Sequence, residues 1–352
     1  MFSISTDIMA TTIHPFLAAC RREPTSFTPV WLMRQAGRYM EEYRKLRAQY
    51  GFLELCKKPD LAAEITVTPV EKLHVDAAIL FADILLILEP MGVGLEYSKG
   101  DGPVIHRPVR SGKDVDGLNE FDVGSELAFV YESVAKIRKE LKNKVPLIGF
   151  AGAPFTLASY LIEGSGSRNY VHTKKLFYSA PEAWKRLMER LAKLIGEYLN
   201  CQIAAGADAV QIFDSWAGCL TPSDYEQFVQ PYTKAVIDAV PPGVPVINFS
   251  TGTSGLLKQL RATGGDVIGL DWRINLDEGW ATVGHDVAVQ GNLDPVALFA
   301  APKEIKSRVA EILRRAGGRP GHIFNLGHGV LPETPVDHVI AMVDAVHELS
   351  AR

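Results

Sequence analysis

The chain is poor in cysteine, carries no large excess of charge of one sign, and has no long apolar run free of breaks. Its cysteines are widely separated and form no C-x-x-C pair; they are Cys20, Cys56, Cys201 and Cys219. This spacing argues against a disulfide framework and against a zinc site, and it suits a reducing cytoplasm. The formal net charge of -4 provides no global basic field for nucleic acid. Residues 1–12 lack the basic and apolar regions of a secretory signal.

One apolar run, from Ala77 to Leu95, has almost the length of a membrane span. Asp83 lies in its middle and Glu89-Pro90 interrupts it, and a lipid-buried helix tolerates neither easily. A buried parallel strand that runs into a loop explains the pattern better.

The remaining composition, 47% hydrophobic and 22% charged, is ordinary for a soluble enzyme. Short apolar runs alternate with helical stretches along the whole chain, without a linker between halves. The predicted strands are 30–33, 77–82, 146–152, 209–213, 245–249, 267–270, 287–290 and 322–325. Eight such runs predict a (β/α)₈ barrel, an α/β fold formed by a single domain. A doubly wound open sheet is the alternative, but no G-x-G-x-x-G follows the first run.

The helices predicted between these strands begin or end at proline, glycine or capping residues. They are 59–73, 126–143, 154–163, 181–205, 222–240, 255–263, 302–316 and 333–349. A short amphipathic helix from Asp7, a plausible N-cap, to Cys20 forms an N-terminal extension. Residues 92–122 are rich in Gly, Pro and charge, and they predict an excursion from the repeat that contains a small hairpin.

The first strand changes character abruptly where it ends. After the apolar residues 30–33 come Arg34, Gln35 and Arg38, with Gly37 between them. Arginine offers a planar fork of donors that matches carboxylate geometry. We therefore predict a site for a molecule with several carboxylates, although a solvated start to the next helix is the simpler interpretation.

Other polar residues also follow predicted strands, and a closed barrel would bring them together at its carboxyl end. They are Asp83, Tyr160, Ser215, Asp271, Asn292 and His328. Asp83 follows a buried run, so its carboxylate needs a cation or several N–H donors. It would serve a ligand or a structural ion pair.

For the other strand-end residues the chemistry stays open. His328 lies between Gly327 and Gly329 and contacts either a ligand or a backbone carbonyl. Tyr160 is a ligand contact or a core tyrosine. Ser215 has no G-x-S-x-G context, so we expect it to donate a hydrogen bond rather than to act as a nucleophile. Asp271 and Asn292 are expected to organise loops.

Several motifs together resemble the uroporphyrinogen decarboxylase family of haem and chlorophyll biosynthesis, over residues 29–338. They are MRQAGRY at 33–39, FADIL at 81–85, GFAGAPFTL at 149–157, QGNLDP at 290–295 and NLGHG at 325–329. The resemblance implies a (β/α)₈ barrel that forms a homodimer and uses no metal or organic cofactor. It also implies the conversion of uroporphyrinogen III to coproporphyrinogen III by decarboxylation of four acetate side chains. The family usually has proline where this chain has Glu41.

The resemblance also assigns site residues by motif. Asp83 would be the central carboxylate. Chemical reasoning on the implied reaction adds Arg34 as a candidate proton donor through a bound water, because guanidinium is too weak an acid to be an easy direct donor. The implied substrate contacts are Arg34, Gln35, Ala36, Gly37, Arg38, Ile79, Asp83, Tyr160, Phe213, Ser215 and His328. Two other hypotheses remain at this point. A zinc- and corrinoid-dependent methyltransferase on the same barrel is disfavoured because Cys56 and Cys219 have no suitably spaced histidine. A non-catalytic tetrapyrrole carrier would need the same arginines.

Overall fold

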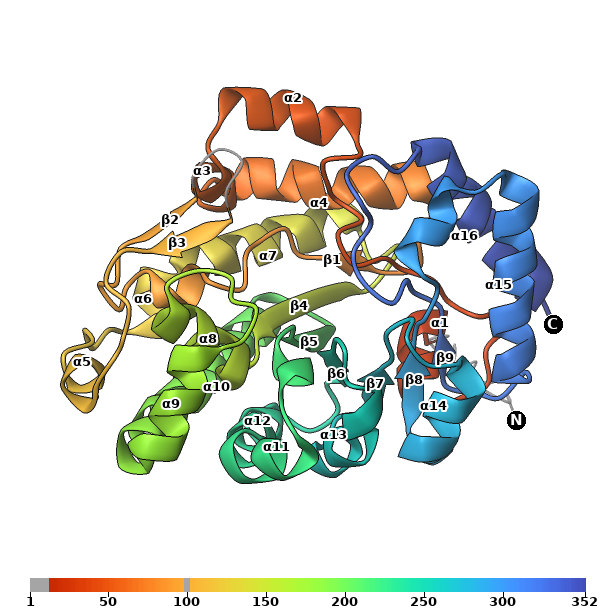
Figure 1. Cartoon of the computed structure of the whole chain (residues 1–352). Helices are drawn as coiled ribbons and strands as arrows, with labels where there is room; N and C mark the ends of the chain where they lie inside the picture. Colours follow the sequence, from red (N-terminus) through yellow and green to blue (C-terminus); the bar gives the residue numbers. More distant parts are fainter. Residues whose placement is uncertain (1–12, 98–101) are drawn as a thin grey trace, which may run out of the picture.

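A parallel β-sheet forms the centre of the protein, and helices cover its outer face (Figure 1). The computed structural model describes residues 13–97 and 102–352. The sheet has seven strands in the order β1-β4-β5-β6-β7-β8-β9. Their bounds are β1 Ala78–Ile79, β4 Leu147–Gly152, β5 Ala209–Asp214, β6 Val246–Ser250, β7 Val267–Gly269, β8 Ala288–Gln290 and β9 His322–Ile323. The strand order follows the chain order, as expected for successive β-α units.

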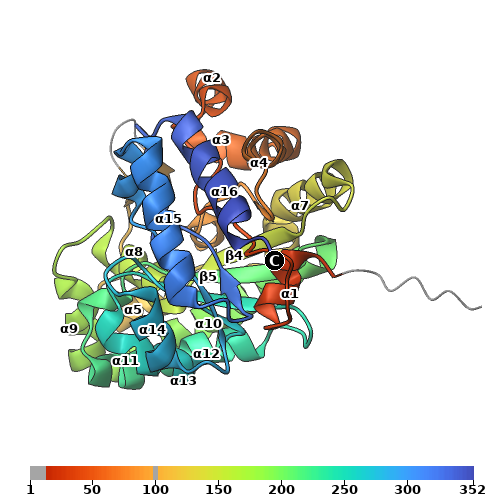
Figure 2. The same cartoon turned by 90° about the vertical axis from the view of Figure 1, so that its right-hand side faces the viewer.

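The main helices form a ring around this sheet. They are α4 Pro59–Leu73, α7 Ala128–Leu141, α10 Pro181–Ala205, α12 Gln230–Asp238, α13 Leu257–Thr263, α14 Leu276–Val283, α15 Pro302–Ala316 and α16 Val336–Ser350. Each packs against the next, and α16 packs back against α4. Figure 2 shows this last part of the ring, with α15 beside α16 and α4 close to both α16 and α7. The fold is therefore a curled, barrel-like α/β structure.

The first predicted strand closes this arrangement only in part. Val30 forms a single parallel bridge with Phe324, beyond the end of β9. On its other side, the Asp76 N–H donates to the Val30 carbonyl at 2.7 Å, just before β1. This first run is thus extended and bonded on both sides, but it is too short to count as a strand. The chain turns at Arg34, whose φ of 59° is left-handed, so the ladder cannot continue.

A chain of polar side chains crosses the interior of the sheet. The Trp31 Nε1–H donates to Gln290 Oε1 at 2.9 Å, and Gln290 Nε2 donates to Gln211 Oε1 at 3.0 Å. All three residues are buried. These bonds tie the segment around Trp31 to β8 and β5 through side chains as well as through its backbone.

Helix ends were predicted best where proline begins the helix. The observed bounds of α4, α8 (Pro154–Glu163), α10 and α15 are those predicted, and each starts with proline at its first position. The predicted helix 222–240 was wrong, because it is two helices, α11 (Pro222–Phe228) and α12. Pro231 explains the break, since it has no N–H to donate and clashes with the carbonyl four residues earlier. The last helix starts at Val336 rather than at residue 333, because Pro335 precedes it.

The remaining elements lie before, between and beyond these units. The hairpin predicted within residues 92–122 is present as β2 (Leu95–Tyr97) and β3 (Pro103–Ile105), which pair antiparallel. The other helices are α1 Pro15–Cys20, α2 Glu41–Gln49, α3 Phe52–Cys56, α5 Gly112–Asp116, α6 Val123–Glu126 and α9 Val171–Ser179. The short 3₁₀ turns are η1 Leu86–Leu88, η2 Ala217–Cys219, η3 Ser254–Leu256 and η4 Pro295–Phe299. The predicted helix from Asp7 to Cys20 was wrong in its start, because α1 begins at Pro15 with His14 as its N-cap; Asp7 itself lies outside the described residues.

Within residues 13–97 and 102–352, no helix is long and apolar enough to cross a membrane. The apolar run at residues 77–95 instead contains the short strand β1 and the turn η1. This outcome agrees with the interpretation of that run as a buried strand followed by a loop.

Candidate active site

Four of the predicted site residues gather at the carboxyl end of the sheet. Arg34 follows the Val30 segment, Asp83 follows β1, Tyr160 lies on α8, and His328 follows β9. Burial raises the pKa of Asp83 and of Tyr160 and lowers that of His328, and the positive charge of Arg34 acts on all three groups, opposing the first two shifts and adding to the third. The contacts agree with this grouping, since a Cβ at Gly329, the neighbour of His328, would lie 2.5 Å from the Cδ of Arg34. The barrel-like fold therefore unites residues that are distant in the sequence.

Asp83 is a half-buried carboxylate that is held by two donors. Its Oδ1 accepts the Leu85 N–H at 2.8 Å and also the hydroxyl hydrogen of Tyr97. Burial raises the pKa of Asp83, and the hydrogen bonds of Tyr97 and Leu85 and the charge of Arg34 oppose that increase. The carboxylate thus combines a fixed orientation with partial removal from water, which strengthens its interaction with any nearby cation.

The position of Arg34 depends on two glycines and on a strained backbone. Its φ of 59° lies in the left-handed region, which costs a non-glycine residue roughly 1 kcal/mol. A Cβ at Gly329 would lie 2.5 Å from the Cδ of Arg34, so the arginine side chain rests directly on that glycine. A Cβ at Gly37 would lie 2.8 Å from the Arg34 carbonyl oxygen. Glycine at both positions therefore lets Arg34 occupy the carboxyl end of the sheet, which we call the mouth.

His328 is a neutral donor in this environment. Burial and the charges of Arg34 and Arg273 lower its pKa to about 4. Its Nδ1 accepts the Gly329 N–H at 2.7 Å, so the proton of the neutral ring lies on Nε2. The ring is thus bonded to a backbone N–H and not to the backbone carbonyl that one alternative predicted, and Nε2–H is left as a donor.

Aromatic side chains line the neighbouring wall. The Tyr160 ring lies 5.7 Å from that of Trp216, and burial raises the pKa of Tyr160 to about 12. Ser215, the residue before Trp216, is half-buried, and its carbonyl accepts the Thr251 hydroxyl hydrogen at 2.8 Å. No hydrogen bond is recorded for the Ser215 hydroxyl within the described residues.

The apolar part of the site comes from the strands themselves. Phe213 on β5 lies edge-on to Phe150 on β4 at 5.5 Å and to Phe249 on β6 at 5.9 Å. A Cβ at Gly269 of β7 would lie 2.5 Å from the Phe249 ring, so glycine there makes room for this aromatic row. Ile79 on β1 is buried. Phe213 is half-buried and is the more accessible of the two predicted apolar contacts.

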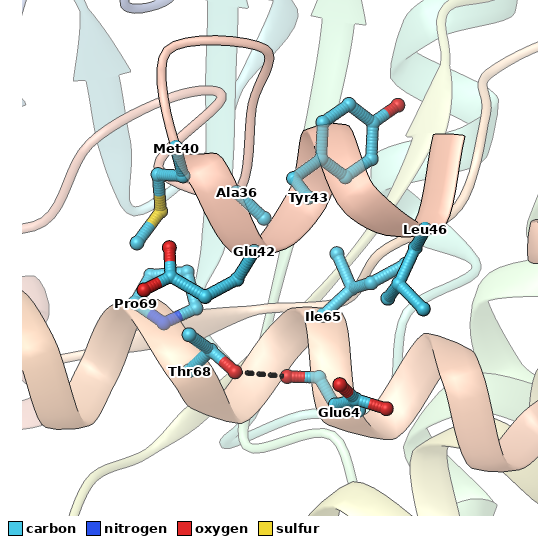
Figure 3. A pocket seen from close by; sticks show the side chains of 9 residues that line it. All are labelled: Ala36, Met40, Glu42, Tyr43, Leu46, Glu64, Ile65, Thr68 and Pro69. Carbon is cyan, nitrogen blue, oxygen red and sulfur yellow. Dashed lines mark hydrogen bonds between the residues drawn. The ribbon is translucent and has the colours of Figure 1, made fainter. Parts of the chain in front are cut away.

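The side chains of Gln35 and Ala36 are directed away from the mouth. Gln35 is buried; its Oε1 accepts the Leu32 N–H and its Nε2 donates to the Ala77 carbonyl, both at 3.1 Å. Its side chain is therefore a brace between the first segment and β1. Ala36 lines a crevice between α2 and α4 that is far too small for a macrocycle. Figure 3 shows Ala36 with the other lining residues Met40, Glu42, Tyr43, Leu46, Glu64, Ile65, Thr68 and Pro69.

This crevice has a volume of about 10 Å³, which is room for about one water molecule. Arg38, on the same loop as Ala36, is exposed, and within the described residues its guanidinium forms no recorded ion pair or hydrogen bond. Of the arginine loop, the structure thus leaves Arg34 and Arg38 as cations that are available to a ligand.

Two residues near the mouth were missed from the sequence. Tyr97 belongs to the hairpin excursion, and no strand-end pattern pointed to it. Arg273 lies two residues beyond Asp271, and the strand-end rule would have found it. Asp271 and Asn292 organise loops as expected: Asp271 Oδ2 accepts the Gly252 N–H at 2.6 Å, and Asn292 Nδ2 donates to the carbonyls of Asp271 and Ile274.

The cysteines are not arranged as metal ligands. Burial raises the pKa of the Cys219 thiol to about 11 and that of Cys56 well above its usual range, which disfavours the thiolate that zinc needs. In the part of the chain that the structure describes, no three His, Cys, Asp or Glu side chains form a group that could hold a metal ion.

Comparison with known proteins gives a consistent result along the whole chain. The family model described as "Uroporphyrinogen decarboxylase (URO-D)" matches residues 11–349. A protein of that name from Carboxydothermus hydrogenoformans is 57% identical over 337 residues, which are 96% of each chain. A second protein named uroporphyrinogen decarboxylase, from Solibacter usitatus, is 55% identical over 334 residues, which are 95% of this chain and 96% of the relative.

The fold is shared more widely. A methyltransferase from Methanosarcina mazei superposes with a TM-score of 0.80 at 21% identity, covering 95% of this chain and 97% of its own. A putative vitamin-B12-independent methionine synthase from Listeria monocytogenes gives a TM-score of 0.60 at 11% identity, covering 94% of this chain and 98% of its own. At such low identity, these two similarities concern the fold alone.

Proposed function

Because the chain belongs to the uroporphyrinogen decarboxylase family, we propose that the cluster around Asp83 and Arg34 is the active site of this carboxy-lyase. The reaction removes the carboxyl group from each of the four acetate side chains of uroporphyrinogen III and gives coproporphyrinogen III. It uses no metal or organic cofactor. The observation that carries the assignment is a half-buried carboxylate, fixed by Tyr97 and Leu85, at the same end of the sheet as the exposed Arg34.

Substrate recognition follows from charge and shape. The macrocycle carries four acetates and four propionates, so its rim is strongly anionic, while its pyrrole N–H groups point inward. Arg34 and Arg38 neutralise and orient carboxylates at the rim, and the Nε2–H of His328 adds a neutral donor. Tyr160 and Ser215 contact the substrate from the α8 and β5 side, and Phe213 and Ile79 pack against the rings. Gln35, Ala36 and Gly37 contribute through the loop backbone.

The chemistry needs a fixed negative charge more than it needs a base. Protonation of a pyrrole ring carbon gives a cationic ring. The bond to the acetate carboxylate carbon then breaks, its electron pair neutralises the ring, and carbon dioxide leaves. Protonation of the remaining methylene carbon and loss of the first proton restore the pyrrole with a methyl group. Asp83 stabilises the cation and accepts hydrogen bonds from the pyrrole N–H groups, as electrostatic preorganisation.

Arg34 supplies the ring proton through a bound water. Guanidinium is too weak an acid to be an easy direct donor. It can, however, orient a water molecule that passes one proton to the ring carbon while it takes up another from the solvent, so that the bound water is restored. Its strained backbone and its contact with Gly329 support such a fixed position.

Three further features belong to the same proposal. Residues 30–33 act as the eighth strand of a closed, single-domain barrel. The backbone bonds of Val30 to Phe324 and to Asp76 join this strand to its two neighbours. Two copies of the chain associate as a homodimer. The enzyme works in the cytoplasm, without nucleic acid or membrane as partner.

Product analysis tests the function directly. The purified protein is incubated with uroporphyrinogen III under reducing conditions, and the porphyrins are then separated by chromatography according to carboxylate number. We expect coproporphyrinogen III from the wild type and a loss of about a hundredfold or more in kcat for Asp83→Ala. Asp238→Ala, which removes an exposed carboxylate paired with Lys234 at 2.9 Å, is the control and should match the wild type.

The outcomes separate the hypotheses. Bound but unconverted substrate in the wild type would identify a carrier and refute the enzymatic proposal. Full activity of a folded Asp83→Ala protein would remove the role assigned to Asp83.

A further inference from the structure

Arg273 is an arginine at the mouth in addition to Arg34 and Arg38, and it is held in a fixed orientation. Its Nη1 donates to Asp271 Oδ2 at 2.6 Å, and its Cζ stands 3.9 Å from the centroid of the Trp272 ring. The side chain is nevertheless 48% exposed. A guanidinium has five N–H donors, and this bond to Asp271 accounts for one of them. No other hydrogen bond of this guanidinium is recorded within residues 13–97 and 102–352.

The loop that carries Arg273 approaches the site beside His328. A Cβ at Gly327 would collide with the Trp272 backbone nitrogen, so this glycine permits the loop to pass. On the other side of His328, Gly329 accommodates Arg34 in the same way. The Trp272 and His328 ring centroids are 6.3 Å apart. The histidine is thus flanked by one arginine-bearing segment on each side.

The ion pair with Asp271 leaves part of the Arg273 guanidinium accessible to a second carboxylate. The side chain of Asp271 is only 2% exposed, and its oxygens also accept the Gly252 N–H at 2.6 Å and the Arg273 N–H at 2.9 Å. The aspartate is therefore fixed by the loop backbone as well as by the ion pair. A second carboxylate can approach the exposed side of the guanidinium without displacing the first.

We propose that Arg273 is a further substrate-binding residue, which pairs with one carboxylate of the macrocycle on the β7 side of the mouth. This inference rests on the proposed function. Stacking on Trp272 restricts the guanidinium plane before the ligand arrives, so less conformational entropy is lost on binding. Because the contact is to a peripheral carboxylate and not to the reacting ring, it contributes to substrate affinity and to the selection of highly carboxylated substrates.

Steady-state kinetics of Arg273→Gln and Arg273→Lys with uroporphyrinogen III test the assignment. For Arg273→Gln we expect KM to rise about tenfold with kcat within about twofold of the wild type, as for the loss of one charge-assisted hydrogen bond. Arg273→Lys keeps the charge but not the planar fork, so its KM should lie between these values. Added salt should raise the KM of the wild type more steeply than that of Arg273→Gln.

Arg261→Gln is the matched control, because Arg261 also forms one ion pair with an aspartate, Asp286, at 2.7 Å. Asp286 precedes β8, so this pair lies at the opposite end of the strands. The control should keep the wild-type KM and kcat. An unchanged KM in Arg273→Gln, or a fall in kcat at constant KM, would overturn the inference. Because the wild type would still consume uroporphyrinogen III, neither result would affect the proposed function, whereas an inactive wild type would refute the function itself.

Discussion

Tyr97 donates its hydroxyl hydrogen bond to Oδ1 of Asp83, and in doing so it links the β2–β3 hairpin to the end of β1. The same oxygen accepts the Leu85 N–H at 2.8 Å. Burial raises the pKa of Asp83, and these two hydrogen bonds favour its ionised form. The hairpin therefore helps to set the charge of the carboxylate on which the proposed reaction depends.

Tyr97→Phe should shift the acid limb of the pH–kcat/KM profile. Loss of the hydroxyl removes a donor to the ionised carboxylate, so the pKa of Asp83 rises further. The enzyme then loses its anion at a higher pH, and we expect the acid limb to move upward by about one pH unit or more. Tyr178→Phe is the control, because Tyr178 is exposed and donates to Asp224 at 2.9 Å. An acid limb that does not move would show that Tyr97 has no influence on Asp83.

Gly329→Ala should displace Arg34 while leaving the fold intact. The new methyl group would lie 2.5 Å from Cδ and 2.7 Å from Cγ of the arginine, which are close to its backbone and cannot simply swing away. We expect kcat/KM for uroporphyrinogen III to fall by about tenfold or more, because a small misplacement of a reacting group is costly. Gly255→Ala, at a glycine with open space around it, is the control. Equal activities in the two variants would contradict this view of Arg34.

Arg38→Gln should raise KM with little effect on kcat. Arg38 is exposed, and its pairing with a substrate carboxylate is partly screened by water, so an increase of about fivefold is expected. Arg308→Gln, which removes an exposed arginine paired with Glu304 on α15, should leave both constants unchanged. Arg38 would lose its role if KM in its variant equalled that of the control.

Asp214 should make the protein less stable as the pH rises toward neutrality. It precedes Ser215 in the chain and is fully buried, its Oδ1 accepts the Thr156 hydroxyl hydrogen at 2.7 Å, and among residues 13–97 and 102–352 its Oδ2 has no hydrogen-bond partner. Burial raises its pKa to about 7, whereas an aspartate in the unfolded chain titrates near 4. Between these values the folded state binds a proton that the unfolded state has released. The free energy of unfolding should therefore fall by up to about 1.4 kcal/mol per pH unit.

Urea unfolding of the wild type and of Asp214→Asn at pH 5 and pH 8 measures this effect. The asparagine cannot ionise, so its variant should lose most of the pH dependence and be the more stable protein at pH 8. Asp238→Asn, at an exposed aspartate, should retain the wild-type slope. Identical slopes in wild type and Asp214→Asn would exclude Asp214 as the source.

The periodicity of apolar residues was sufficient to predict the strands of the sheet and most of the helices, because buried parallel strands and proline-initiated helices have strong local patterns. It could not predict how little of residues 30–33 would pair. That outcome depends on the left-handed φ of Arg34, a non-glycine residue for which no local pattern predicts such a conformation.

The same turn explains why the sequence predicted the positions of some candidate site residues but not the side-chain directions of others. Arg34, Asp83 and His328 follow strands, and the general rule for barrels was enough to group them. The directions of the Gln35 and Ala36 side chains depend on the turn and could not be inferred from spacing. Tyr97 arrives from an excursion outside the repeat, and its approach to Asp83 is a tertiary contact without a local signature.

The polar chain from Trp31 through Gln290 to Gln211 has a consequence for engineering. Arg34 follows Trp31 by three residues, so the start of its loop is fixed to β8 and β5 by these two side-chain hydrogen bonds in the interior of the sheet. Grafting the loop onto another scaffold without these hydrogen bonds would transfer the guanidinium group but not the orientation of the Arg34 side chain. A successful transplant has to carry both glutamines along with the arginines.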